Sequence, residues 1–168
     1  MQETPFGQPA RHRLRTLGLI ALPLGVGAIS SLMTSDAMAQ FGRLNQPPLS
    51  PPAWLFPVAW TILYVLMGAA SARLVGYEPA DEGERTMRKV ALVLYGLQLA
   101  VNFAWSLVFF GLGAYWVAFA MLVVMWLHIA VLTALAFRLD RVAGLMLVPY
   151  LAWTTFAGYL NVAIALMN

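Results

Sequence analysis

Apolar residues fill five long stretches of this chain, and charged residues fall almost only between them. The stretches lie near residues 16–35, 54–74, 89–110, 114–137 and 142–166, and they contain no Asp or Glu. A helix needs about 20 such residues to cross a hydrocarbon core of about 30 Å. Helices can satisfy their own backbone hydrogen bonds in lipid without a partner segment. The pattern therefore predicts an all-α fold, an integral membrane five-transmembrane-helix bundle.

The amino-acid composition supports the same class of protein. Of the 168 residues, 61% are hydrophobic and 10% are charged, whereas soluble domains carry about 25% charged residues. We divide the chain into a basic N-terminal segment, residues 1–15, and one transmembrane domain, residues 16–168. Cysteine is absent, which excludes disulfides and thiolate metal sites, and we expect no metal site and no obligatory cofactor.

The first apolar stretch has two interpretations. Three arginines between residues 11 and 15 precede it, and Ala37-Met38-Ala39 resembles the cleavage site of a secretory signal peptide. The apolar run 14–33 is longer than the about 7–15 residues of a signal core and can span the bilayer. We interpret it as a transmembrane helix, and cleavage near Gln40 is the alternative.

Basic residues mark one side of the membrane. Nine of the ten Lys and Arg residues lie in the segments that share one side, and Arg43 is alone on the other. Short cytoplasmic loops retain such residues. We therefore expect a multi-pass protein of a bacterial cell membrane with its N-terminus cytoplasmic and its C-terminus extracytoplasmic. The same placement explains the net charge of +3, so no nucleic-acid partner is predicted.

The first loop on the far side is rich in proline, which fixes φ and favours a stiff, extended path. Four prolines lie within residues 44–52. We interpret this loop as a rigid lid in which Pro47, Pro51 and Pro52 are the residues of interest. A simple connector between the first two helices is the alternative.

Polar and aromatic residues recur at helical spacing in three of the predicted helices. An amide inside a membrane faces protein rather than lipid, and we expect these stripes to line one ligand cavity. The alternative for the amides is hydrogen bonding between helices without a ligand, worth about 1 kcal/mol each. The candidate ligand-binding residues are Trp60, Tyr64, Gln98, Asn102, Trp105, Tyr150, Trp153, Ala157 and Asn161.

Small residues form the opposite stripe of the third predicted helix. Gly96, Ala100 and Ala104 are spaced four residues apart, which allows the backbone of another helix to approach closely. We predict that this stripe is the interface of a homodimer, and packing within the monomer is the alternative.

His128 is the one histidine inside a predicted span. No second metal ligand lies near it in the sequence, so we expect a neutral, hydrogen-bonded histidine of the core.

Three motifs together resemble those of one membrane protein family. They are Pro51-Pro52-x-x-x-Phe56-Pro57-x-x-Trp60-Thr61-x-x-Tyr64, Gln98-Leu99-x-x-Asn102-x-x-Trp105-Ser106, and Pro149-Tyr150-Leu151-x-Trp153 followed by Phe156-Ala157-x-x-Leu160-Asn161. In this order, over roughly residues 16–166, they are similar to the translocator protein and tryptophan-rich sensory protein family, formerly called peripheral-type benzodiazepine receptors.

The resemblance implies a five-helix bundle, commonly a homodimer, with a cavity that binds porphyrins and, in relatives, sterols and synthetic ligands. The expected partners are therefore a porphyrin or another flat hydrophobic small molecule, with the porphyrin as ligand, and the lipid bilayer. The implied function is tetrapyrrole binding by a sensor, carrier or regulator of porphyrin handling.

A second implied function is enzymatic, because light- and oxygen-dependent porphyrin breakdown is attributed to some family members. The tryptophans linked to that activity correspond to Trp60 and Trp153, which would then be catalytic. An indole can stack on a macrocycle and donate an electron. An ion-coupled transporter is a third possibility, weakened by the lack of acidic residues in the spans.

This sequence departs from the family pattern in its first loop. Gln40, Phe41, Gln46 and Leu49 replace residues that the family carries there. No forward sterol-recognition motif is present near the C-terminus. We therefore expect lid contacts that differ from those of relatives, and sterol binding is not favoured.

Overall fold

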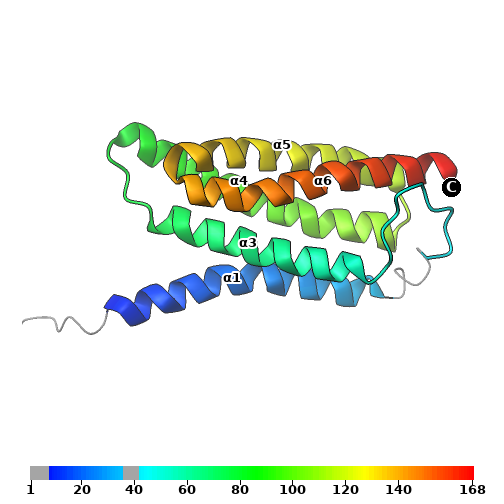
Figure 1. Cartoon of the computed structure of the whole chain (residues 1–168), viewed down its shortest axis with the longest axis horizontal. Helices are drawn as coiled ribbons and strands as arrows, with labels where there is room; N and C mark the ends of the chain where they lie inside the picture. The colour runs from blue at the N-terminus through cyan, green and yellow to red at the C-terminus, as the bar shows by residue number, and fades with distance from the viewer. Residues whose placement is uncertain (1–7, 36–41) are drawn as a thin grey trace, which may run out of the picture.

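The structure, a computed structural model, describes residues 8–35 and 42–168. Its five long helices are α1 (Gln8–Met33), α3 (Leu55–Gly76), α4 (Glu82–Ser106), α5 (Tyr115–Leu139) and α6 (Arg141–Met167), and a π-helix, η1 (Leu107–Gly111), continues α4. All five are long and apolar enough to cross a membrane. They run side by side along the molecule (Figure 1). The predicted five-helix membrane bundle is therefore confirmed.

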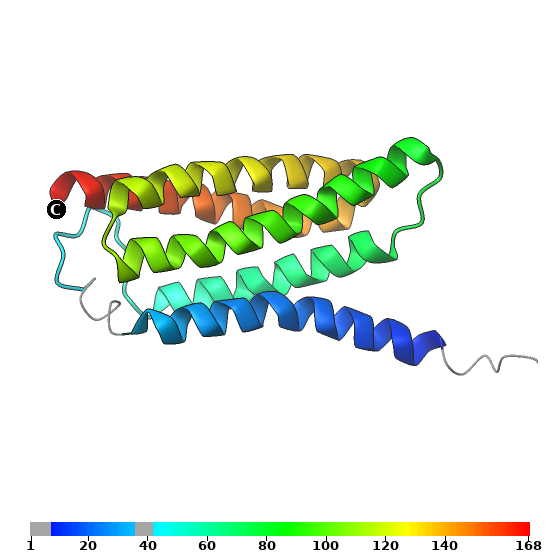
Figure 2. The ribbon, with the colours of Figure 1, turned by 180° about the vertical axis from the view of Figure 1, so that it is seen from behind.

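The helices form a bundle in which α1 lies at the edge. Helix α5 packs on α4 and α6, while α3 packs on α6 and α1, and the view from behind shows α1 beside α3 (Figure 2). Gly68 allows this contact, because a Cβ there would lie 2.5 Å from the Cα of Ile20. The centre of the bundle is thus enclosed mainly by α3, α4, α5 and α6.

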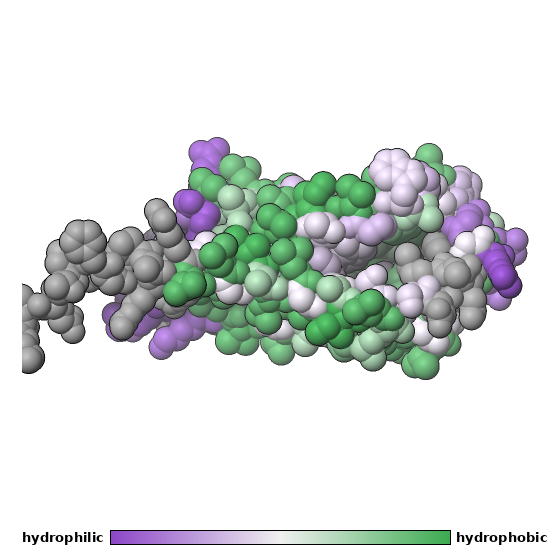
Figure 3. Space-filling model, turned by 90° about the horizontal axis from the view of Figure 1, so that it is seen from below, coloured by the Kyte–Doolittle hydropathy of each residue, from purple (hydrophilic) through white to green (hydrophobic). Residues whose placement is uncertain are grey.

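The outer surface of the bundle is apolar along the middle of its length. Large side chains such as Leu22, Ile29, Val131 and Leu145 are about half exposed. Hydrophobic side chains cover the middle of the face seen in Figure 3, and hydrophilic ones gather toward its ends. A soluble monomer rarely exposes so large an apolar surface, so the protein is an integral membrane protein that lies in a lipid bilayer.

Two helices begin earlier in the chain than predicted. Helix α1 begins at Gln8, so residues 8–15 of the basic segment are helical, while the part of α1 apolar enough to span a membrane is Thr16–Met33, as predicted. Helix α4 begins at Glu82 rather than near residue 89, because the Asp81 side chain accepts a hydrogen bond from the Glu84 N–H at 2.8 Å. Acidic residues in the first turn also suit the helix dipole. The sequence Ala37-Met38-Ala39, like Gln40 and Phe41, lies outside the described residues.

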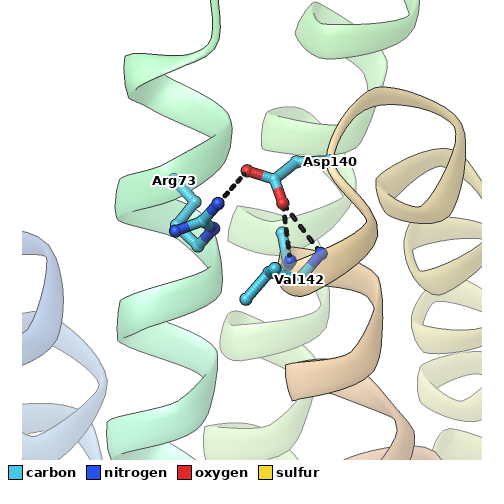
Figure 4. Close-up of polar contacts among 4 residues, drawn as sticks. Arg73, Asp140 and Val142 are labelled. Carbon is cyan, nitrogen blue, oxygen red and sulfur yellow. Dashed lines mark hydrogen bonds and ion pairs between the residues drawn. The ribbon is translucent and has the colours of Figure 1, made fainter.

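One end of the bundle, which we call the basic end, contains the start of α1, the end of α3, the start of α4 and the α5–α6 turn. There the Arg73 guanidinium pairs with the Asp140 carboxylate at 2.8 Å (Figure 4). Asp140 also accepts hydrogen bonds from the N–H groups of Val142 and Ala143, which caps α6. Partial burial raises the pKa of Asp140, but the bonds from Arg73 and the two amides outweigh it and hold the pKa below its usual range.

The connection between α3 and α4 is fixed by Tyr77, whose hydroxyl donates to Glu84 at 2.8 Å while its carbonyl accepts from Arg88. The hydrogen bond to the Glu84 carboxylate raises the pKa of the Tyr77 hydroxyl. This connection, residues 77–81, is therefore shorter than residues 75–88, the gap between the two predicted spans.

Candidate functional site

An aromatic cavity lies toward the opposite end of the bundle, which we call the C-terminal end because α6 ends there. Three helices supply its walls: the first turns of α3, the end of α4 with η1, and the second half of α6. The lining residues are Phe56, Trp60, Trp105, Phe109, Phe110, Trp153, Phe156, Ala157, Leu160, Asn161 and Ile164. Nearly all of this wall is apolar, with one amide, which is the usual character of a small-molecule site.

The π-helix brings two successive phenylalanines against one tryptophan. The Leu112 N–H donates to the Leu107 carbonyl five residues earlier, at 3.1 Å, which widens this turn. Phe109 stacks on Trp105 with ring centroids 5.2 Å apart, and Phe110 meets the same indole edge-on at 6.0 Å. A regular α-helix would not turn both rings to the same neighbour, so η1 builds this part of the wall.

The cavity is almost filled by its own side chains. Its free volume is about 30 Å³, roughly the share of one water molecule. Trp60 and Trp105 lie 6.4 Å apart between ring centroids, and Phe56 meets Trp153 edge-on at 6.2 Å. A flat ligand larger than water must therefore separate these rings to enter.

Four of the predicted site residues form a hydrogen-bond network deeper in the bundle, next to the cavity. The ring of Trp60 in the cavity wall lies 5.5 Å from that of Tyr64 and 6.3 Å from that of Tyr150 between centroids. Tyr64 donates to the Asn102 carbonyl oxygen at 2.9 Å, and Tyr150 donates to the Gln98 carbonyl oxygen at 2.7 Å. The Asn102 amide donates to the Tyr150 hydroxyl at 3.3 Å. All four side chains are buried, and none lines the cavity.

Five of the nine candidate residues line the cavity in this structure, and Tyr64, Gln98, Asn102 and Tyr150 lie in this network instead. Helical spacing placed them on one stripe, but Gln98 and Asn102 lie one to two turns nearer the basic end than Trp105. In lipid, polar groups at that depth stabilise the bundle by bonding to one another. Gln98 and Asn102 therefore make the hydrogen bonds between helices that the alternative describes, and ligand contact by these two amides stays a prediction.

The other five candidates do line the cavity: Trp60, Trp105, Trp153, Ala157 and Asn161. Asn161 is held on both sides, since its oxygen accepts from the Trp105 indole N–H at 3.3 Å and its nitrogen donates to the Tyr115 carbonyl at 2.8 Å. The amide therefore has a fixed orientation in the wall. Ligand contact by these five residues stays a prediction.

Several wall residues were not among the predicted site residues. Phe56 and Phe156 belong to the sequence motifs, and Leu160 and Ile164 continue the α6 stripe at helical spacing. Including the apolar positions of the motifs and of the stripe would have identified all four. Phe110 had no such signal, because it faces the cavity through the π-turn.

The proline-rich loop closes the C-terminal end by bonding to α6. The Tyr159 hydroxyl donates to the Pro48 carbonyl at 2.7 Å, and Asn45 exchanges hydrogen bonds with Asn168. Figure 1 shows this loop reaching the end of α6 before it returns to α3.

The three prolines of the predicted lid differ in exposure. Pro47 is buried, Pro51 is half-buried and Pro52 is exposed. The loop covers the end of the bundle without contributing to the cavity wall, and a role in admitting ligand stays a prediction.

The predicted dimer stripe faces outward. Gly96 and Ala100 are exposed and Ala104 is half-buried, and a Cβ at Gly96 would meet no atom within 4 Å. The alternative of packing within the monomer is therefore wrong for Gly96 and Ala100. The dimer itself stays a prediction.

His128 is half-buried, and its Nδ1 atom has no hydrogen-bond partner among the described residues. The expected hydrogen bond is therefore not made at that nitrogen. The described part of the chain also contains no group of three His, Cys, Asp or Glu residues that could hold a metal ion.

Comparison with known proteins agrees with the fold. Residues 19–167 match the model of the TspO/MBR family. The chain belongs to the TspO/MBR family. It is 40% identical over 159 residues to the tryptophan-rich protein TspO of Chlorobaculum tepidum, covering 93% of this chain and 98% of the relative.

Other TspO/MBR relatives include a bacterial and a human protein. Identity is 42% over 121 residues to the tryptophan-rich sensory protein of Cereibacter sphaeroides, with 72% of each chain covered. It is 32% over 142 residues to the translocator protein of Homo sapiens, with 84% of this chain and 82% of the relative covered. These similarities confirm the family resemblance that the three sequence motifs indicated.

Proposed function

We propose that this TspO/MBR protein binds tetrapyrroles in the aromatic cavity and acts as a sensor, carrier or regulator of porphyrin handling. The observation that carries the proposal is the convergence of three tryptophans and four phenylalanines from three helices on one cavity. Aromatic faces stack on a flat macrocycle and remove its apolar surface from water. The names of the relatives, sensory and translocator, agree with a role in small-molecule handling.

Binding requires the cavity to open. Its free volume of about 30 Å³ is far below the about 300–1,000 Å³ of ligand pockets. The macrocycle would replace ring–ring contacts such as that between Trp60 and Trp105 with contacts to its own faces. Asn161 would meet a polar edge of the ligand. If the ligand enters from the C-terminal end, the hydrogen bonds that join the proline-rich loop to Tyr159 and Asn168 would have to break.

We also propose that the protein forms a homodimer through Gly96, Ala100 and Ala104. The exposure of the first two residues supports this proposal, because small residues on a lipid-facing stripe let a second helix approach closely.

A second candidate function is light- and oxygen-dependent porphyrin breakdown. It is favoured by one observation, that Trp60 and Trp153 line the same cavity, so one bound macrocycle could contact both indoles. If the protein only binds, Trp153→Phe should weaken affinity about tenfold or less, near 1.4 kcal/mol, without an effect under illumination. If it degrades porphyrin, light-dependent loss of the ligand should fall far more than affinity does.

Tryptophan fluorescence tests the proposed function. We expect protoporphyrin and hemin to quench the fluorescence of the purified protein with a saturable titration curve, and cholesterol to have little effect. Trp54 and Trp116 are exposed and lie off the cavity wall, so replacing both with Phe should lower the total emission but leave the midpoint of the titration unchanged. Quenching that rises without saturation, or that is equal for cholesterol, would argue against a tetrapyrrole site.

A further inference from the structure

A second, wider depression lies at the basic end, on the outer face of α3. Helices α1 and α6 both pack against α3, and neither packs substantially on the other. The depression between them has a free volume of about 570 Å³, and we call it the α3 groove. Its size falls within the range of small-molecule sites.

Small side chains form the floor of the α3 groove. Ala69, Ala72 and Gly76 follow one another at helical spacing along α3, with Ile20 of α1 and Met146 of α6 on either side. This part of the groove is apolar and lies along the last turns of a membrane-spanning helix. A hydrocarbon chain aligned with the bundle is therefore its natural occupant.

Charged side chains gather where the groove reaches the end of α3. Arg73, Glu78 and Asp140 all line it, and Figure 4 shows Arg73 on α3 beside Asp140 at the start of α6. Because α3 ends at Gly76, these groups lie at the depth at which a span leaves the hydrocarbon core. A ligand of this groove must therefore be apolar along the helix and polar at its end.

The three charged side chains of the groove differ in how many hydrogen bonds and ion pairs they make within the protein. Both Asp140 oxygens are used, one by Arg73 and the other by two backbone amides. Arg73 is 44% exposed and makes one ion pair, which leaves further N–H donors of its guanidinium available. Glu78 is exposed and has no hydrogen bond or ion pair with any residue that the structure describes.

We propose that the α3 groove binds a phospholipid with an ethanolamine headgroup, taken from the leaflet at the basic end. The phosphate would accept from the remaining Arg73 donors, and the ammonium group would donate to the Glu78 carboxylate. One acyl chain would lie over Ala69 and Ala72. The binding is independent of the tetrapyrrole site, which lies toward the other end of the bundle.

The charges of the groove select this headgroup over two common others. One guanidinium and two carboxylates give the lining a net charge of −1 (+1 − 2), which disfavours a phosphatidylglycerol headgroup that carries a phosphate and no cation. A choline headgroup is zwitterionic, but its quaternary nitrogen has no N–H to donate to Glu78. Only the ethanolamine headgroup of these three supplies both a phosphate and an N–H donor.

Native mass spectrometry of the purified full chain tests this proposal. The protein is released from detergent after incubation with an equimolar mixture of phosphatidylethanolamine, phosphatidylcholine and phosphatidylglycerol that carry the same acyl chains. We expect phosphatidylethanolamine to be retained about two- to fivefold over each of the others, the ratio that one exposed ion pair supplies.

The variants separate headgroup recognition from a general effect of charge. Glu78→Gln should bring the ethanolamine-to-choline ratio close to one, and it breaks no hydrogen bond or ion pair with any residue that the structure describes. Glu82→Gln removes the same charge from the first turn of α4 at the same end, outside the groove, and should keep the parental ratio. Arg73→Gln should reduce retention of the ethanolamine and choline lipids alike, and Arg73→Lys should restore part of it.

Three results would overturn the proposal. They are equal retention of the three lipids by the parent, preferential retention of phosphatidylglycerol, and a Glu78→Gln variant that behaves like Glu82→Gln. Arg73 also pairs with Asp140, so helicity measured by circular dichroism confirms that each Arg73 variant is folded. The Glu78 comparison decides the proposal even if an Arg73 variant does not fold.

Discussion

Tyr150 connects two amides at the centre of the bundle, donating to Gln98 and accepting from Asn102. Tyr150→Phe keeps the ring but leaves a carbonyl oxygen and an amide hydrogen without this partner. We expect a loss of about 0.6–2 kcal/mol in the free energy of unfolding, measured by thermal denaturation in detergent. Porphyrin affinity should change little, because Tyr150 does not line the cavity. A large loss of affinity with unchanged stability would mean that Tyr150 contacts the ligand.

Asp140 gives the stability a pH dependence with a defined sign. Its pKa is lowered from the ordinary value of 3.8, so its contribution is present above pH 3.8 and is lost as pH falls through the lowered pKa. Asp140→Asn should still accept hydrogen bonds at the start of α6 but should lose the ion pair with the exposed Arg73, about 0.2–1 kcal/mol.

Thermal unfolding measured from pH 7 down to pH 3 checks this effect. The difference between parent and Asp140→Asn should be largest near neutral pH and should shrink below pH 3.8. A difference that grows as the pH falls would contradict the role assigned to the carboxylate.

At the scale of elements, the outward stripe of α4 makes a prediction about assembly. Ala100 is exposed, so Ala100→Leu should not disturb the monomer but should separate two helices that pack through small residues. We expect the variant to shift toward monomer in crosslinking experiments in mild detergent. Ala134→Leu, the same change at an exposed position of α5, is the matched control. An unchanged crosslinking pattern in Ala100→Leu would argue against this interface.

The sequence predicted the five long helices but not all of their ends. Apolar runs of about 20 residues identify spans, because lipid demands them. The start of α4 at Glu82 depends instead on one capping side chain, Asp81, among charged residues that also suit a solvated loop. The π-turn of η1 depends on packing among Trp105, Phe109 and Phe110, which helical periodicity does not contain.

The candidate site could also be predicted only in part from helical periodicity. Helical phase correctly grouped Trp105 and Asn161, which are hydrogen-bonded to each other. Helical phase also assigned Gln98 and Asn102 to the same cavity. Phase gives the direction of a side chain, but it does not show whether a side chain of a neighbouring helix fills the space that the first one faces. The partners of those amides, Tyr64 and Tyr150, come from two other helices, so only the packed bundle shows that the network is closed.

At the scale of the whole molecule, the distribution of basic residues predicts the orientation in the membrane. A reporter fused after Asn168 should be extracytoplasmic, whereas one inserted near Glu82 should be cytoplasmic. N-terminal sequencing of the membrane-bound protein decides whether the chain is cleaved near Gln40. The reverse labelling pattern would contradict the orientation, because the C-terminal end with its aromatic cavity would then face the cytoplasm.

The central claim is that the aromatic cavity at the C-terminal end is a tetrapyrrole site, and porphyrin affinity in paired tryptophan variants tests it most directly. Titration of protoporphyrin by its own absorbance avoids the loss of tryptophan signal in these variants. Trp60→Phe with Trp153→Phe should weaken binding by more than tenfold, over about 1.4 kcal/mol, because two indoles of the wall are lost. Trp54→Phe with Trp116→Phe, which changes two exposed indoles off the wall, should bind as the parent does. Equal affinity in both double variants would contradict the account.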